Sequence, residues 1–277
     1  MPTLQRRQIA GMNIHYLYYS LDYFLDAQAD LGFEAIELWG GMPHFWLDHS
    51  SIGDCSAMRR KLTERGLSLA VFTPENCIYP YQVAACEADH RAKSKAYFAN
   101  GIRAAAELGC RIMEINSGWG NRDEPREEAW QRSLDMLRSL AEIAGKEGVK
   151  LAIESLRPEE SNLVTDIPSM RAMLAQVDHP ALKPMIDTCA MGVAGETLDG
   201  WFDAFGEDII HIHFVDGTPY GHLVWGDGDR SMAAYVQSLN DHGYQGFLGQ
   251  EITDGRYLDD PREADRRNMQ HYLPFIA

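Results

Sequence analysis

The strongest constraint on the fold is a regular alternation of short apolar runs and longer amphipathic segments along the whole chain. Apolar runs of about six residues are typical of parallel strands that are buried on both faces. Such strands are expected at residues 9–16, 33–39, 67–73, 110–117, 149–155, 183–188, 208–215 and 246–252. Segments whose apolar residues recur every three or four positions are expected to be helices, at 20–31, 55–65, 89–108, 126–147, 166–177, 198–206, 231–242 and 261–275. Eight strand–helix units in succession predict an α/β fold, the (β/α)8 TIM barrel.

Glycines at the expected helix ends support this fold. A glycine that follows a helix and precedes a strand commonly adopts the left-handed C′ conformation, and five positions fit this pattern: Gly32, Gly66, Gly109, Gly148 and Gly243. A doubly wound open sheet is the alternative, but the GxGxxG motif expected after its first strand is missing. The chain has 277 residues and no linker-like segment, so we expect a single barrel domain over residues 1–277.

Composition restricts the partners and the compartment. The chain carries 41 acidic and 25 basic side chains, a net charge of -16, so neither nucleic acid nor an anionic membrane is an expected partner. The five cysteines form no CxxC pair, which argues against a disulfide scaffold and a thiolate zinc site. The N-terminal segment lacks the apolar region of a signal peptide, and no apolar run is long enough to span a membrane. These features predict a cytoplasmic protein that binds a small molecule.

Four metal-binding side chains lie near the ends of four successive predicted strands: Glu154, Asp187, His213 and Glu251. The ends of parallel barrel strands meet at one mouth, and three carboxylates with one imidazole suit a hard or borderline divalent cation. Alone, each residue would more often be a helix cap or a surface charge. Together they would be costly buried charges unless a cation compensates them. His211 lies on the same strand face as His213, one layer deeper. Both could be ligands, or one could be a core histidine; we favour His213 as the ligand and expect His211 to support the site or to be structural.

Aromatic and polar side chains follow the predicted strands at the same mouth. Candidate substrate-binding residues are Trp39, His44, Glu75, Trp119 and Glu160. Aromatic rings at a barrel mouth suit the apolar face of a sugar or a carbon chain, and Glu160 could bind hydroxyl groups, although a solvated loop carboxylate fits equally well.

One short motif and one missing motif argue against phosphate binding and against hydrolase chemistry. The GDG segment at 226–228 lacks the surrounding residues of a phosphate-binding loop, so we interpret it as a turn beside the active site. The chain contains no GxSxG motif, which argues against a hydrolase with a nucleophile elbow.

Several segments of the chain resemble the xylose-isomerase-like TIM-barrel family of sugar isomerases and epimerases, and within it most of all the fructoselysine 3-epimerases. The resemblance runs nearly end to end and is clearest in FEAIELWGGMPHFW (33–46), VFTPENCIYPY (71–81), LAIESLRPEESN (151–162), MIDTCA (185–190), HIHFVDGT (211–218) and GDG (226–228). The combined Trp-Gly-Gly, Thr-Pro-Glu and Tyr-Pro-Tyr signatures are more specific than the metal site, which the wider family shares.

The resemblance implies one divalent metal ion, Mn2+ or a similar ion (Mg2+, Co2+, Ni2+, Fe2+ or Zn2+), bound by Glu154, Asp187, His213 and Glu251. It also implies that Glu154 and Glu251 form the acid/base pair and that Glu160 contacts the substrate near the reacting carbon. Barrels of this family often pair through their mouths, so a homo-oligomer, a dimer or tetramer, is expected.

Two departures from the ketohexose 3-epimerases bear on the substrate. Those enzymes carry a histidine where this chain has Ala190, and an arginine shortly after the metal-binding histidine, where this chain reads Asp216-Gly217-Thr218-Pro219. Both residues hold the far end of a simple ketohexose, so their absence favours a substituted ketose. If the substituent carries an ammonium group, Glu75 and Asp216 are candidates to meet it.

The expected function is therefore metal-dependent 3-epimerisation of a substituted 2-ketose such as fructoselysine, interconverted with psicoselysine. One glutamate would remove the C3 proton to give a cis-enediolate, and the other would return a proton from the opposite face. Alternatives on the same fold are a ketose/aldose isomerase, a hexulose 3-epimerase and a keto-sugar dehydratase or lyase. A non-catalytic sugar-binding barrel and an apurinic-endonuclease-like protein are further alternatives, and the charge of -16 argues against the endonuclease.

Overall fold

The computed structural model describes residues 4–77 and 80–277, and its strands form one parallel sheet in the order β6-β5-β4-β3-β2-β1-β9-β8-β7. The strands are β1 (Ile9–Met12), β2 (Ala35–Gly40), β3 (Ser68–Pro74), β4 (Ile112–Asn116), β5 (Lys150–Glu154), β6 (Leu182–Pro184), β7 (Ile186–Asp187), β8 (His211–His213) and β9 (Phe247–Gln250). Only Met185 separates β6 from β7, so the two edges of the sheet meet. The sheet thereby closes into the predicted TIM barrel, which is confirmed.

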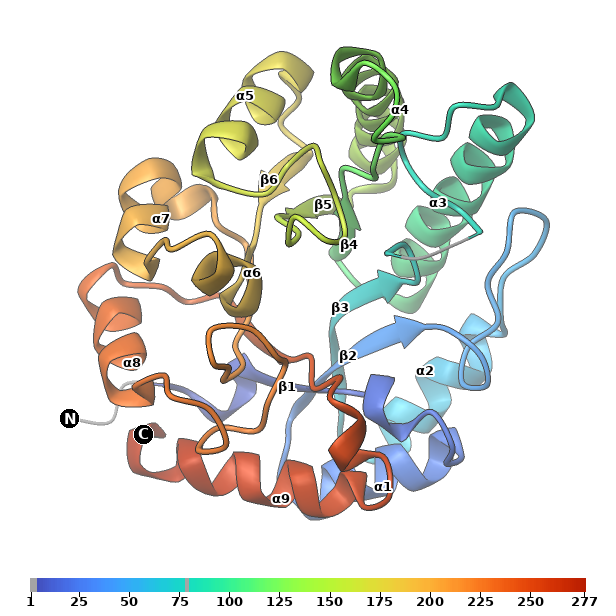
Figure 1. Cartoon of the computed structure of the whole chain (residues 1–277). Helices are drawn as coiled ribbons and strands as arrows, with labels where there is room; N and C mark the ends of the chain where they lie inside the picture. Colours follow the sequence, from blue (N-terminus) through green and yellow to red (C-terminus); the bar gives the residue numbers. More distant parts are fainter. Residues whose placement is uncertain (1–3, 78–79) are drawn as a thin grey trace.

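Helices surround the barrel, as Figure 1 shows in a view along its axis. They are α1 (Leu21–Asp30), α2 (Cys55–Glu64), α3 (Ala88–Leu108), α4 (Arg126–Glu147), α5 (Ile167–Val177), α6 (Thr188–Val193), α7 (Leu198–Phe205), α8 (Met232–Asp241) and α9 (Pro261–Tyr272). Short 3-10 helices are η1 (Arg6–Gln8), η2 (Ile14–Tyr16), η3 (Gly206–Asp208), η4 (Gly255–Tyr257) and η5 (Leu273–Phe275). The five glycines predicted at helix ends all have positive φ, between 64° and 80°, which confirms the C′ assignment.

The structure departs from the predicted elements between residues 183 and 215, and also at residues 14–16, which form η2 instead of the end of the first predicted strand. The strand expected at 183–188 ends at Asp187, because the Asp187 carboxylate accepts hydrogen bonds from the backbone N–H of Cys189 (2.8 Å) and Ala190 (3.0 Å) and so starts α6. The strand expected at 208–215 shortens to β8, since residue 208 belongs to η3. Tyr79, part of the Tyr-Pro-Tyr signature, lies outside the described residues.

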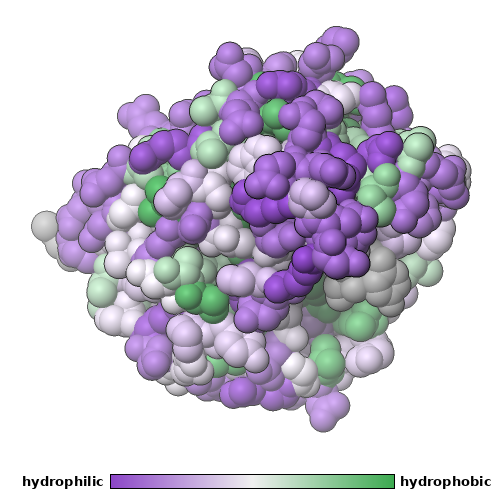
Figure 2. All heavy atoms as spheres, turned by 45° about the horizontal axis from the view of Figure 1, so that its top comes forward, coloured by the Kyte–Doolittle hydropathy of each residue, from purple (hydrophilic) through white to green (hydrophobic). Residues whose placement is uncertain are grey.

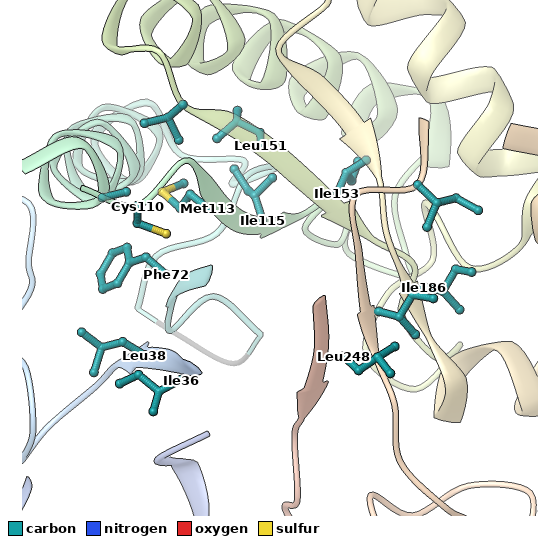
Figure 3. Close-up of a cluster of buried hydrophobic side chains, with 14 of the residues drawn as sticks. Ile36, Leu38, Phe72, Cys110, Met113, Ile115, Leu151, Ile153, Ile186 and Leu248 are labelled. Carbon is teal, nitrogen blue, oxygen red and sulfur yellow. The ribbon is translucent and has the colours of Figure 1, made fainter. Parts of the chain in front are cut away.

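Alternation along the strands divides apolar from polar side chains. Ile36, Met113, Ile153 and Leu248 belong to the buried hydrophobic cluster drawn in Figure 3. Their sequence neighbours point to the opposite face of each strand, into the barrel. This inward set includes Glu37, Glu114 and Glu154, and the same alternation applies to Asp187, His211 and His213, which lie next to Ile186 and Ile212 of the cluster. The barrel interior is therefore polar at the level where chemistry is expected.

Hydrophilic residues predominate on the face drawn in Figure 2, and hydrophobic ones are scattered over it. Within residues 4–77 and 80–277, no helix is both long and apolar enough to cross a bilayer.

Gly249 on β9 allows a buried carboxylate to approach the strand. A Cβ atom at this position would lie 2.2 Å from Oε2 of Glu37 and 3.0 Å from the ring of His211. Both of these side chains are fully buried, so neither can move aside into solvent. A side chain at position 249 therefore has to displace the polar interior of the barrel.

Gly249→Ala is expected to lower the free energy of unfolding by about 1–3 kcal/mol, the usual cost of overpacking a closely packed core. Urea denaturation of the purified variant measures this change. Gly255→Ala is the matched control, because the nearest atom to its Cβ, Cδ1 of Leu258, is 4.0 Å away. Equal stability of the two variants would contradict the packing argument.

Candidate active site

The four predicted metal ligands lie at the ends of neighbouring strands on the inner side of the barrel. Glu154 is the last residue of β5, Asp187 of β7 and His213 of β8, and Glu251 follows β9 directly. The His213 imidazole is 1% exposed and the Glu154 side chain 7%. These side chains therefore converge at one mouth, as the strand-end positions predict.

His213 joins two of the carboxylates. Its Nδ1 lies 2.8 Å from Oε1 of Glu154 and 3.1 Å from Oε2 of Glu251. Asp187 is connected to this group through His222, a residue that we did not predict. Nε2 of His222 lies 3.2 Å from Oδ2 of Asp187 and 3.3 Å from Oε2 of Glu251. The structure thus brings the whole predicted quartet together, with a second imidazole among its oxygen atoms.

Glu37 on β2 lies beneath this cluster and orients both histidines of β8. Its Oε1 accepts hydrogen bonds from Oγ1 of Thr73 (2.5 Å) and from Nε2 of His213 (3.0 Å), and its Oε2 lies 2.9 Å from Nε2 of His211. Burial opposes ionisation of Glu37, but the two histidines outweigh it and hold its pKa well below the usual range. Because Nε2 of His213 is bound to Glu37, Nδ1 faces the strand-end carboxylates. Glu37 was not predicted from the sequence, although a charged residue inside the apolar run AIELW was a signal for it.

Electrostatics show how crowded the carboxylates are. Burial, with the nearby charges of Glu251 and Asp187, raises the pKa of Glu154 to about 8 in spite of His213. Burial and Glu154 also raise the pKa of Glu114, a buried residue of β4, well above its usual value. Burial works against the charged form of Asp187 too, but His222 and His213 lower its pKa to about 2. Acidic groups in this interior therefore depend on nearby positive charge.

The donor set fits a divalent cation. One donor atom each from Glu154, His213 and Glu251 lie within 4.8 Å of one another. Asp187 is a fourth donor close to them, because His222 contacts both Asp187 and Glu251. Carboxylates with imidazole suit hard and borderline ions, and the contact of His213 with Glu37 is the supporting hydrogen bond that metal-binding histidines usually make. Cys189 is close to Asp187 and His222, but burial raises the pKa of its thiol to about 12, so it is a poor ligand.

Comparison with known proteins agrees with this geometry. The family model for the xylose isomerase-like TIM barrel matches residues 25–274. The chain belongs to the xylose isomerase-like TIM barrel family. Fructoselysine 3-epimerase of Shigella flexneri is 29% identical over 255 residues, which cover 91% of this chain and 92% of that protein. D-psicose 3-epimerase of Ruminiclostridium cellulolyticum is 22% identical over 86% of this chain and 82% of its own length.

A solved structure of 3-keto-D-glucoside 4-epimerase from E. coli shares the fold, with a TM-score of 0.78 and 17% identity over 96% of this chain and 99% of that one. Both sequence relatives are sugar epimerases. This barrel is accordingly an isomerase-class enzyme.

Two of the predicted substrate-binding residues contact each other at the barrel mouth. The indole N–H of Trp39 donates to Oε2 of Glu75 (3.1 Å), and Oε1 of Glu75 accepts from the backbone N–H of Cys77 (3.1 Å). Trp39 and Glu75 line a hollow of about 610 Å³ together with aromatic residues that include Trp46 and Tyr81.

Trp119 and Glu160 line a second, smaller hollow of about 300 Å³ with Cys77. Arg157 binds both carboxylate oxygens of Glu160, with Nη2–Oε1 at 2.5 Å and Nε–Oε2 at 3.0 Å. The guanidinium of Arg157 also stacks on the ring of Tyr220, 5.1 Å from its centroid. Glu160 is therefore held in a fixed orientation, and its contact with substrate stays a prediction.

His44 uses both ring nitrogens in local packing. Nδ1 accepts from the Asn13 side-chain amide (2.8 Å), and Nε2 donates to the backbone oxygen of Tyr19 (2.9 Å). The ring is buried, and burial lowers its pKa. These bonds favour a packing role for His44, and its contact with substrate stays a prediction.

Asp216 organises the loop that follows β8. Its carboxylate is fully buried and accepts hydrogen bonds from the backbone N–H of Gly217 (2.8 Å), Gly226 (2.9 Å), Gly228 (2.9 Å) and Arg230 (3.1 Å). The expectation that Asp216 meets an ammonium group is therefore wrong, because its oxygens hold the loop instead. The GDG segment forms the turn that surrounds this carboxylate.

Glu37→Gln is expected to weaken binding of Mn2+ by about 10- to 100-fold, the usual effect of removing a partner of a metal-binding histidine. The amide keeps the size of the side chain but not the negative charge that fixes the orientation of His213. Isothermal titration calorimetry measures the affinity, with Glu34→Gln, at an exposed position, as the control. An affinity equal to that of the wild type would show that Glu37 does not support the site.

Proposed function

We propose that this chain is a metal-dependent 3-epimerase of a substituted 2-ketose, such as fructoselysine interconverted with psicoselysine. One observation carries the proposal: Glu154 and Glu251 approach the same His213 nitrogen, at 2.8 Å and 3.1 Å, from strands β5 and β9. Inversion at a carbon next to a ketone needs two proton-transfer groups that reach the carbon from different sides. Two carboxylates that converge from separate strands meet this requirement.

The protein residues perform the proton transfers. One of Glu154 and Glu251 removes the C3 proton, which gives a cis-enediolate, and the other delivers a proton to the opposite face of C3. A divalent ion, Mn2+ or a similar one, held by Glu154, Asp187, His213 and Glu251 would stabilise the negative charge that develops on the ketose oxygens. Glu37 fixes the His213 ring from below. The chain is proposed to act in the cytoplasm as a homo-oligomer.

The residues at the mouth of the barrel favour a substrate larger than a free hexulose. Ala190 stands where ketohexose epimerases carry a histidine and is buried at the start of α6, so no large side chain fills that position. The hollow of about 610 Å³ beside Trp39 and Glu75 is rich in aromatic rings, which suit a carbon chain. We propose that this hollow receives the substituent of the ketose.

Glu154→Gln and Glu251→Gln are each expected to lower the epimerisation rate by about 100- to 10,000-fold, the contribution of a positioned general acid or base. NMR in D2O with Mn2+ and a ketosamine detects deuterium that enters at C3 while the carbonyl stays at C2.

Glu147→Gln, at an exposed position at the end of α4, is the control and should retain full activity. Unchanged turnover in Glu154→Gln with metal still bound would rule out its role in proton transfer. Movement of the carbonyl to C1 would instead favour an aldose/ketose isomerase.

Glu75→Gln is expected to raise the KM for a ketosamine with a free ammonium group about 10- to 100-fold, because one charge-assisted hydrogen bond contributes about 1.5–3 kcal/mol. The KM for uncharged D-psicose should stay close to that of the wild type, since that substrate has no cation for Glu75 to meet. Steady-state kinetics with both substrates measure the difference. An equal change for both would place Glu75 outside the recognition of the substituent.

A further inference from the structure

His222 lies among the proposed metal ligands, although the proposed mechanism gives it no role. It belongs to the loop between β8 and α8, and its side chain is 12% exposed. Its Nε2 is 3.2 Å from Oδ2 of Asp187 and 3.3 Å from Oε2 of Glu251. Both of those oxygens belong to residues that would bind the ion.

The spacing of the donor atoms resembles one coordination shell. Bonds to ions such as Mn2+, Mg2+ and Zn2+ are about 2.0–2.2 Å long, so two neighbouring ligands at a right angle lie about 3 Å apart. The contacts along the cluster fall in this range: 2.8 Å for Glu154 with His213, 3.1 Å for His213 with Glu251, 3.3 Å for Glu251 with His222 and 3.2 Å for His222 with Asp187. His222 closes the gap between Glu251 and Asp187 in this series.

The second nitrogen of His222 is held in the way that a metal-binding histidine requires. Nδ1 of His222 lies 2.9 Å from Oγ1 of Thr253, and the backbone N–H of Thr253 donates to the His222 carbonyl (3.3 Å). With Nδ1 on Thr253, Nε2 is the ring atom that faces Asp187 and Glu251, and a divalent ion would take the place of any proton that it carries. His213 has the same arrangement, with Nε2 on Glu37 and Nδ1 toward the carboxylates.

The loop between β8 and α8 also fixes the position of His222 through its neighbour Leu223. Asp216 and Leu223 form an antiparallel bridge, and Leu223 directly follows His222. The Asp216 carboxylate is in turn fixed by backbone N–H groups of its own loop. A long loop thus carries one imidazole to a defined position, which an incidental surface contact would not need.

From these contacts we infer that Nε2 of His222 is a fifth protein ligand of the divalent ion. The inference rests on the metal site of the proposed function and extends it to two imidazoles and three carboxylates. Imidazole nitrogens suit Fe2+, Ni2+ and Zn2+, whereas Mg2+ prefers oxygen ligands and keeps its waters. His222 therefore also makes the site selective against Mg2+.

Pulsed electron paramagnetic resonance of the Mn2+-loaded wild-type protein tests this without any turnover. Nitrogen couplings from two coordinated imidazoles are expected in the wild type and from one in His222→Ala. His90→Ala removes an imidazole that is 61% exposed on its side chain and should keep both couplings. Calorimetry should show Mn2+ binding weakened by at least about tenfold in His222→Ala, with a smaller loss for Mg2+.

The outcomes separate the inference from the proposed function. A single coordinated imidazole in the wild type would overturn the role of His222 while leaving the metal site intact. Unchanged Mn2+ affinity in His222→Ala, with a raised KM, would overturn it too and make His222 a substrate contact. Absence of Mn2+ binding by the wild type would overturn both the inference and the metal-dependent mechanism. The wild-type spectrum decides the question even if the variant fails to fold.

Discussion

The site depends on the ion-pair cluster of His213 with the carboxylates around it inside the barrel. Burial disfavours charged carboxylates, and it raises the pKa of Glu154 to about 8 even next to His213. His213 can serve Glu154 and Glu251 only because Glu37 binds its other nitrogen. Glu37 in turn fits beneath the strands because β9 has a glycine at position 249. Core packing and chemistry thus depend on the same few side chains.

The fold could be predicted from the sequence because its signals are local. Apolar runs separated by amphipathic helices fix the strand–helix order, and glycine at position 109, like its four counterparts, has the positive φ expected after a helix. The error at residue 188 also has a local cause. Asp187 was assigned to a strand as a ligand, yet its carboxylate also caps α6, and one residue performs both tasks because a strand end and a helix start coincide there.

The rest of the site could not be predicted because it depends on contacts between distant segments. Strand-end positions were enough to propose Glu154 and His213, but Glu37 meets the β8 histidines across the barrel interior, from a strand that is not their neighbour in the sheet. His222 lies in a loop, where no periodicity indicates which way a side chain points. Asp216 was misread for the same reason, since its partners are backbone groups up to 14 residues away.

The loop after β8 positions His222 independently of the strand-end residues. The strand-end residues Glu154 and His213 are fixed by the register of the sheet, whereas His222 is placed by the bridge between Asp216 and Leu223. Successive side chains in paired extended segments point to opposite faces, so a shift of one residue in that bridge would turn His222 away from Asp187. The buried Asp216 carboxylate opposes such a shift, because it binds both Gly226 and Gly228 across the turn. A change of loop length would therefore move His222 and leave Glu154 and Glu251, the proposed proton-transfer pair, in place.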